Sequence, residues 1–240
     1  MQYLVIDIET IPDQTPNAID DIAKDFEVKS PDLTKPKLID ALELDPATAK
    51  FKTVPELKEM WLDKFAGQAK VEQAKEKWLK TSFDGGRGQI CEICISNDDF
   101  EKSYTDKDYE SEADMLKAMW YDISEEFYGR CPTLVAHNAK FDLPFVYHRC
   151  VVNKVNPVIG FKPHGRHDSD YFCTMEAWAG FGGKISLNRL ASYLGINGKD
   201  GMTGADVWPE HQKGNHEKIS EYCRDDARIT KQIYKRLKFA

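Results

Sequence analysis

The sequence predicts an α/β fold in which a mixed β-sheet is flanked by helices. Three short segments, residues 2–8, 89–96 and 133–138, have the apolar, β-branched composition of buried strands. Amphipathic segments with helical spacing alternate with the later strands, a pattern typical of a sheet covered by helices. The 240 residues are 41% hydrophobic and 11% aromatic, which is enough to form a folded core.

The remaining elements follow from local signals along the chain. Further strands are expected at about 102–105 and 168–173, and helices at about 110–128, 141–149, 187–194 and 217–237. Ser186 has the position of a helix N-cap. Gly129 and Gly195 each follow a helical pattern, where glycine commonly ends a helix.

Residues 12–88 are expected to form a helical insertion within a single domain that spans 1–240. This segment is lysine-rich and contains several prolines. A loop of this length without structure would be unusual in a compact domain, so we expect packed helices. The residues on which this packing is predicted are Leu57, Met60, Trp61, Phe65 and Trp78. Lysines such as Lys75, Lys77 and Lys80 suit either a nucleic-acid backbone or an ordinary solvated face.

Composition also narrows the class of protein. The net charge of −7 and pI of about 5.5 disfavour a protein that coats nucleic acid through a basic face. The start, MQYLVIDIET, lacks the features of a signal peptide, and no apolar run reaches the roughly 18 residues of a membrane span. Six scattered cysteines indicate free thiols in a reducing cytoplasm. We therefore expect a cytoplasmic protein that does not contact membranes.

Acidic residues occur in three segments that contain candidate chemistry. Asp7 and Glu9 are two apart on a predicted strand, so their side chains share one face. Asp142 lies where a strand hands over to a helix, and Tyr222 and Asp226 share a face of the last helix. Taken singly, these are better explained as surface acids, a helix N-terminal acid and a half-buried tyrosine. Together they place an acid on each of three different elements.

In combination, the segments resemble the three motifs of the DEDD superfamily of 3′→5′ exonucleases. The matching residues are Asp7-Ile8-Glu9-Thr10, Asn138-x-x-Phe141-Asp142-x-Pro144-Phe145, and Tyr222-Cys223-x-x-Asp226-Ala227 preceded by Ser186-Leu187-Asn188. Position 221, where the histidine branch carries its base, is Glu221, so the resemblance is to the tyrosine (DEDDy) branch. Proofreading domains of family-B DNA polymerases and stand-alone polymerase-B-like exonucleases of phage and bacteria are similar. The resemblance covers residues 1–11 and about 80–240.

This resemblance implies an RNase H-like fold and metal-dependent hydrolysis of DNA from its 3′ end to nucleoside monophosphates. Carboxylate ligands favour Mg²⁺ or Mn²⁺, and two such ions about 3.5–4 Å apart would activate water and stabilise the departing oxygen. By resemblance, Asp7, Glu9, Asp142 and Asp226 hold the ions, and Tyr222 with Glu9 orients the water. The residues implied to contact the terminal nucleotides are Thr10, Ile11, Asn138 and Phe141. The implied partners are DNA and proteins of replication or recombination, in the host cytoplasm if the protein is phage-encoded.

Three alternatives remain open from the sequence. The catalytic residues do not separate DNA from RNA, so an exoribonuclease of the same superfamily is one. A catalytically idle exonuclease fold that only binds nucleic acid is another, although all four acids and the tyrosine are kept. The third is a helical interaction protein whose function lies in residues 12–88.

Other signals are interpreted as structural. Cys91-x-x-Cys94 resembles half a zinc knuckle, but residues three apart on a regular strand point to opposite faces. His137 is expected to be packed or hydrogen-bonded. The basic residues of segment 162–167 are expected to form a solvated loop, with a phosphate contact as the alternative.

Overall fold

The computed structural model describes residues 2–163, 171–198 and 201–239. The chain forms two compact units. The sheet unit consists of Met1–Asp13 and Thr81–Ala240, and the helical unit consists of Gln14–Lys80. The division into one domain with an insertion at 12–88 stays a proposal.

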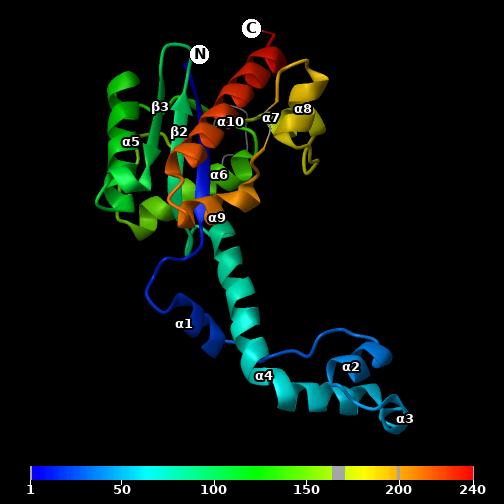
Figure 1. The fold of residues 1–240 in the computed structure, drawn as a ribbon. Helices are drawn as coiled ribbons and strands as arrows, with labels where there is room; N and C mark the ends of the chain where they lie inside the picture. The colour runs from blue at the N-terminus through cyan, green and yellow to red at the C-terminus, as the bar shows by residue number, and fades with distance from the viewer. Residues whose placement is uncertain (1, 164–170, 199–200, 240) are drawn as a thin grey trace. The chain divides into compact units, whose positions relative to one another are not determined.

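A mixed five-stranded sheet forms the centre of the sheet unit (Figure 1). Its strands are β1 (Tyr3–Ile11), β2 (Gln89–Ser96), β3 (Glu101–Thr105), β4 (Thr133–Ala136) and β5 (Tyr171–Cys173). The order is β3-β2-β1-β4-β5, so the first strand is also the central one. It pairs antiparallel with β2 and parallel with β4. The predicted fold class, a mixed sheet flanked by helices, is confirmed.

Helices cover both faces of this sheet. Those of the sheet unit are η1 (Lys80–Phe83, whose first residue belongs to the helical unit), η2 (Asp106–Asp108), α5 (Glu112–Glu126), α6 (Ala139–Val152), α7 (Thr174–Ala179), α8 (Leu187–Tyr193), η3 (Gly204–Asp206), α9 (Val207–Gln212) and α10 (His216–Leu237). Apolar residues of α5 and α6 share the largest core cluster with one face of β1 and β2. The helix α10 packs on the opposite face, against β1, β2 and β4 (Figure 1).

Alternation along β1 decides where its acids lie. Leu4, Ile6 and Ile8 join the core under α5 and α6, whereas Val5 packs with residues of α10. Side chains at every second position share a face, so Asp7 and Glu9 lie on the α10 side of the sheet. The pairing of β1 with β2 shifts between Glu9 and Thr10, which is a β-bulge directly beside the acids.

The same bulge changes the direction in which Cys91 points relative to Cys94, which corrects the expectation from the sequence. Glu9 pairs with Glu92 and Thr10 with Ile90, so Cys91 is the extra residue. Cys91 and Cys94 consequently both pack against α10 instead of pointing to opposite faces. Burial raises the pKa of both thiols, with the pKa of Cys94 reaching about 12, so thiolate ligands are disfavoured there. The zinc-knuckle interpretation stays rejected, but for a different reason.

Several elements differ from the sequence prediction. The helix expected at 141–149 starts at Ala139, and the short helices α7 and α9 were not expected. The strand expected at 168–173 is present as Tyr171–Cys173, and residues 168–170 lie outside the described part of the chain. The strand predicted at 89–96 has those bounds in the structure.

The helical unit contains α1 (Ala18–Lys24), α2 (Lys35–Ala41), α3 (Pro46–Ala49) and α4 (Val54–Leu79). A capping box between Thr53 and Glu56 begins α4, which agrees with a helix start directly before the apolar repeat. The core of the helical unit forms around Leu38 and Leu57. The rings of Trp61 and Phe65 pack beside this core, with their centroids 5.5 Å apart. None of the helices in the described part of the chain combines the length and apolarity that crossing a bilayer requires.

Candidate active site

Asp7 lies in the middle of the central strand and Glu9 two residues nearer its C-terminal end, both on the face that α10 covers. Glu9 is buried, and Oδ2 of Asp7 is buried without a hydrogen-bond partner among the described residues. Burial raises the pKa of Asp7 well above its usual range, and the negative charges of Asp226, Glu9 and Asp142 raise it further. A buried carboxylate among other carboxylates is unfavourable unless protons or cations compensate the charge.

Asp142 is brought to this pair by the first turn of α6. It is 6% exposed, and burial raises its pKa to about 7. Hydrogen bonds with backbone groups, including that of Ile8, lower this pKa in part, whereas the charge of Asp226 raises it. Ile8 lies between Asp7 and Glu9 in the sequence, so this contact with its backbone places Asp142 beside the two acids of β1.

Tyr222 and Asp226 contribute the α10 side of the site. Burial raises the pKa of the Tyr222 phenol, and so do the charges of Glu9, Asp226 and Asp7. The phenol is therefore protonated at neutral pH and available as a hydrogen-bond donor. The structure thus gathers all five residues predicted to be catalytic, from three distant segments, beside the C-terminal half of β1.

Cys223 is a neighbour of this cluster that the sequence prediction did not include. Its Sγ and carboxylate oxygens of Asp7 and Glu9 lie within 4.8 Å of one another. Burial and the charge of Asp7 raise the pKa of the thiol, which donates to the backbone oxygen of Asp7 over 3.4 Å. A protonated thiol is a poor ligand for a hard cation, so carboxylate oxygens are the donors that matter here.

The four residues predicted to contact nucleotides differ in their exposure and in their contacts. Asn138 is exposed at the N-cap of α6, and its side chain makes no capping hydrogen bond. Phe141 is partly buried against Phe145, with ring centroids 5.5 Å apart. The Thr10 hydroxyl donates to the backbone oxygen of Ser82 over 2.7 Å. Ile11 is 2% exposed and packs in a core cluster, so this structure gives it no open surface for a nucleotide.

Phe83 is a candidate binding residue that sequence reasoning missed. Its side chain is 73% exposed, and its ring centroid lies 6.3 Å from that of Phe141. The Thr10–Ser82 hydrogen bond holds the backbone before Phe83 next to the strand that carries Glu9. A second bond, from the amide of Asp13 to Oγ1 of Thr81 over 2.8 Å, secures the same segment. No periodicity or motif predicted this position, since the contact joins residues 58 positions apart in the chain.

Residues 88–240 match the family of predicted 3′-5′ exonucleases related to the exonuclease domain of PolB. The chain belongs to this family. No curated protein was found to match the chain. The matched segment contains Asp142, Tyr222 and Asp226, whereas Asp7 and Glu9 precede it and join the site through the central strand of the sheet.

The hydrogen bonds of His137 indicate a structural role. Its Nε2 faces the backbone oxygen of Ile185 at 2.9 Å, which requires a proton on Nε2. Burial lowers the pKa of His137, so the ring is neutral and Nδ1 accepts from the Thr174 hydroxyl at 2.9 Å. Of the basic loop predicted at 162–167, residues 164–167 lie outside the described residues.

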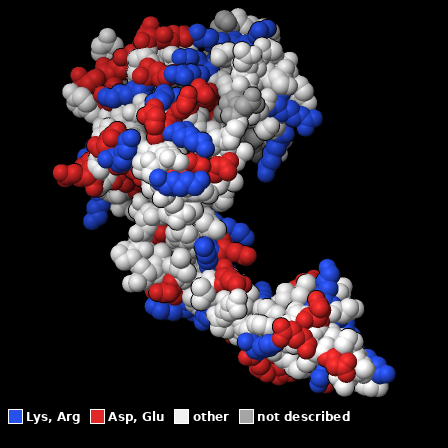
Figure 2. Space-filling view, in the orientation of Figure 1, with Lys and Arg blue, Asp and Glu red and all other residues white. Residues whose placement is uncertain are grey.

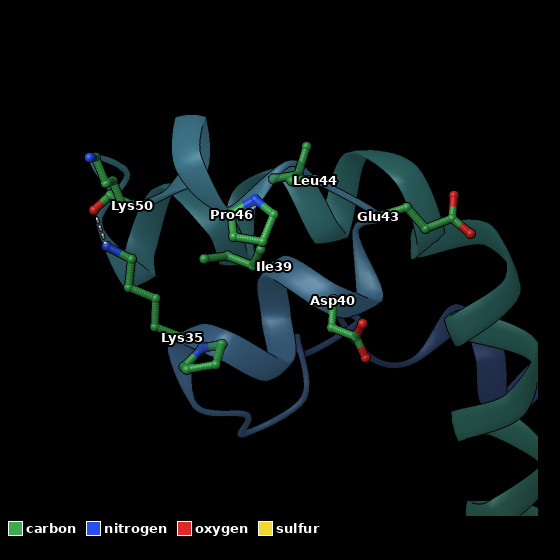
Figure 3. Close-up of a pocket in the computed structure, with 8 residues that line it drawn as sticks. Lys35, Ile39, Asp40, Glu43, Leu44, Pro46 and Lys50 are labelled. Atoms are coloured by element: carbon green, nitrogen blue, oxygen red, sulfur yellow. Dashed lines mark hydrogen bonds between the residues drawn. The ribbon is translucent and has the colours of Figure 1, made fainter.

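Charge on the surface of the protein is mixed. On the face shown in Figure 2, basic and acidic side chains of the described residues are interspersed in both units. The helical unit also has a surface hollow of about 720 Å³ (Figure 3). Its lining residues are Lys35, Pro36, Ile39, Asp40, Glu43, Leu44, Pro46 and Lys50. None of them belongs to the acidic cluster, which consists of Asp7, Glu9, Asp142 and Asp226.

Proposed function

We propose that this exonuclease hydrolyses DNA from the 3′ end in a metal-dependent reaction that releases nucleoside monophosphates. One observation supports this most strongly. Asp7, Glu9, Asp142 and Asp226 converge from β1, α6 and α10: the charges of the other three raise the pKa of Asp7, and the charge of Asp226 raises the pKa of Asp142. Four converging carboxylates are costly in a protein and suit a site that binds divalent cations.

The chemistry of the donor set supports Mg²⁺ or Mn²⁺ as the cofactor. The residues that would hold two such ions are Asp7, Glu9, Asp142 and Asp226. The clearest sign that a cation fits there is the buried Oδ2 of Asp7, which has no hydrogen-bond partner in the described part of the chain. When bound, the ions supply a nucleophilic water at neutral pH and stabilise negative charge on the departing 3′ oxygen.

The chain's own residues orient the reactants. The protonated phenol of Tyr222 donates a hydrogen bond that positions the attacking water. The Glu9 carboxylate accepts a hydrogen bond from the same water. The presence of the tyrosine at this place, with Glu221 exposed beside it, supports membership of the DEDDy branch, as in stand-alone phage and bacterial enzymes. Phe141 and Phe83 offer ring faces to unstacked bases, and the exposed Asn138 amide offers hydrogen bonds to the strand.

The test is a gel time course with 5′-labelled single-stranded DNA, duplex DNA and RNA of matched sequence. We expect a descending ladder on single-stranded DNA with Mg²⁺ or Mn²⁺ and none in EDTA. A bulky group on the 3′ hydroxyl should stop the reaction, and cleavage that continues from the 5′ end would overturn the polarity. Faster loss of RNA than of DNA would favour an exoribonuclease, and binding without cleavage under all conditions would indicate an idle fold.

We further propose that residues 12–88 are an insertion that contacts long strands through lysines. Lys75, Lys77 and Lys80 are all exposed, but Nζ of Lys77 lies 3.6 Å from the ring centroid of Phe26 and contributes to packing. Replacing Lys75 and Lys80 by Gln should weaken binding of long DNA strands and flatten its salt dependence by about two counterions. Cleavage of a dinucleotide should be unchanged. Equal loss on both substrates would contradict this role, and unchanged binding would favour a separate interaction function for the helical unit.

All six cysteines lie within the described residues and none is in a disulfide there. Free thiols are typical of a reducing compartment, so we propose the cytoplasm as the place of action. The partners that we propose from the motif resemblance are proteins of replication or recombination.

A further inference from the structure

A second group of metal-ligand side chains lies outside the acidic cluster. It consists of Asp106, His211 and His216, which come from η2 after the third strand, from α9 and from the first position of α10. One potential ligand atom from each residue lies within 4.8 Å of the other two. The proposed exonuclease reaction uses none of these three residues.

The atoms of this group are arranged around the Asp106 carboxylate. Nε2 of His211 lies 2.7 Å from Oδ2 of Asp106, and Nδ1 of His216 lies 3.4 Å from Oδ1. Both carboxylate oxygens therefore face imidazole nitrogens. Oδ1 of Asp106 is buried and has no hydrogen-bond partner among the described residues, which is unfavourable for a carboxylate oxygen.

We propose that Asp106, His211 and His216 bind one divalent transition-metal ion of the Zn²⁺ class, with water completing the coordination. Two imidazoles and one carboxylate are a ligand set that zinc accepts and that magnesium does not favour. With metal–ligand bonds of about 2.0–2.1 Å, neighbouring ligands of a tetrahedral ion lie about 3.3–3.4 Å apart. The 3.4 Å separation between His216 and Oδ1 matches that value, whereas the 2.7 Å separation between His211 and Oδ2 is a hydrogen-bond distance that would lengthen by about 0.6 Å when the ion enters.

The surroundings of the group are suited to hold the ligands in place. The ring of Trp208 stacks on His211 at 5.8 Å and 20°, which restricts the orientation of the imidazole. The side chains of His211, His216 and Asp106 are 18%, 20% and 26% exposed, so an ion could enter from solvent while the site remains mostly enclosed. A bound ion would join the end of β3 to α9 and to the start of α10, the helix that carries Tyr222 and Asp226.

The site is tested with the full chain after treatment with a chelator. Asp7→Asn and Asp226→Asn are combined in one background, which removes two ligands of the proposed catalytic site. Zn²⁺ is titrated by calorimetry, and Co²⁺ is added separately to record its visible absorption spectrum. We expect one Zn²⁺ per chain in this background and a tetrahedral Co²⁺ spectrum that Mg²⁺ does not displace.

Adding His216→Asn to this background should weaken Zn²⁺ binding by at least roughly 100-fold, because even outer-shell changes cost about 10–100-fold. His148→Asn, which removes an exposed imidazole elsewhere, should leave binding unchanged. Circular dichroism in chelator should be the same for all variants, and His211→Gln provides a second ligand change if His216→Asn fails to fold. Zn²⁺ binding that His216→Asn and His211→Gln leave unaltered, or no Zn²⁺ binding at all, would overturn the proposal.

Discussion

Two neighbouring acids on α10 have different surroundings. Asp226 faces β1, where its charge raises the pKa of Asp7 and of Asp142. Asp225 instead contacts Arg228 over 3.3 Å, and its side chain is 40% exposed. Adjacent helix positions point about 100° apart, so only one of the two acids reaches the site.

Asp226→Asn should accordingly lower the rate of DNA cleavage by several orders of magnitude, whereas Asp225→Asn should leave it within a few-fold of the wild type. Tyr222→Phe removes one hydrogen bond to the water and should cost about 10²-fold in kcat. Single-turnover rates on a short labelled strand give all three values. Near wild-type cleavage by Asp226→Asn would mean that Asp226 does not belong to the third motif.

Phe83 provides a second prediction at the scale of a single side chain. Stacking of a base on an aromatic ring is worth about 1–3 kcal/mol, so Phe83→Ala should raise KM for single-stranded DNA roughly 10-fold. The acids are untouched, so kcat should change little. Phe239→Ala, which removes another exposed ring (97%) near the C-terminus, is the control. Equal KM values for the two variants would argue against a stacking role.

At the scale of elements, a buried ion pair joins α5 to α6. Nη2 of Arg149 lies 2.6 Å from Oε2 of Glu112, and the two side chains are 6% and 8% exposed. Arg149 also donates to the backbone oxygen of Gly85 over 3.2 Å, and Glu112 accepts from the amide of Ile90 over 2.9 Å. The pair thus fixes α5 and α6 to the start of β2 and to the segment that precedes it.

Removing one charge of this pair should be more harmful than neutralising both. Arg149→Met leaves the Glu112 carboxylate buried and should lower the free energy of unfolding by about 3–5 kcal/mol. In the double variant Arg149→Met, Glu112→Gln, a neutral amide oxygen still accepts from Ile90, so part of this loss should be recovered. Urea unfolding at neutral pH measures both, and a double variant less stable than the single one would contradict this account.

Sequence patterns predicted the longer elements because these repeat their apolar spacing several times. The strand at 89–96 and the last helix are examples, with the helix starting at His216 instead of Glu217. The helices α7 and α9 have six residues each, which is too short for a helical period to be visible. The bulge at Cys91 was also hidden, because the sequence of one strand does not reveal its pairing register.

At the scale of the molecule, the acidic site was predictable only in combination. Asp7, Asp142 and Asp226 are each unremarkable acids in sequence, and the order of the three segments indicated their convergence. Contacts without such a motif were missed. Phe83 meets Phe141 across 58 positions, and His211 meets Asp106 across 105. These meetings depend on how α6, α9 and α10 pack on the sheet, which local patterns do not encode.

One buried acid outside the proposed metal ligands makes the stability of the whole sheet unit depend on pH. Glu92 of the second strand is fully buried and accepts from the Ser220 hydroxyl of α10 over 2.9 Å. Burial raises its pKa to about 7, and the hydrogen bond from Ser220 only partly offsets this. Because the pKa of Glu92 is higher in the folded than in the unfolded chain, its favourable contribution is present below about pH 4.5 and is lost as pH rises through 7.

Glu92→Gln keeps the shape and the hydrogen-bonding capacity of the side chain while removing its charge. In EDTA, we expect the variant to gain stability relative to the wild type between pH 5 and pH 8.5, with an upper limit of about 3 kcal/mol. Urea unfolding at both pH values gives this difference. Glu221→Gln, an exposed change on α10, should show no such gain. A Glu92→Gln effect of equal size at both pH values would mean that Glu92 ionises in the folded protein as readily as in the unfolded chain, and that its burial between β2 and α10 carries no penalty for the charge.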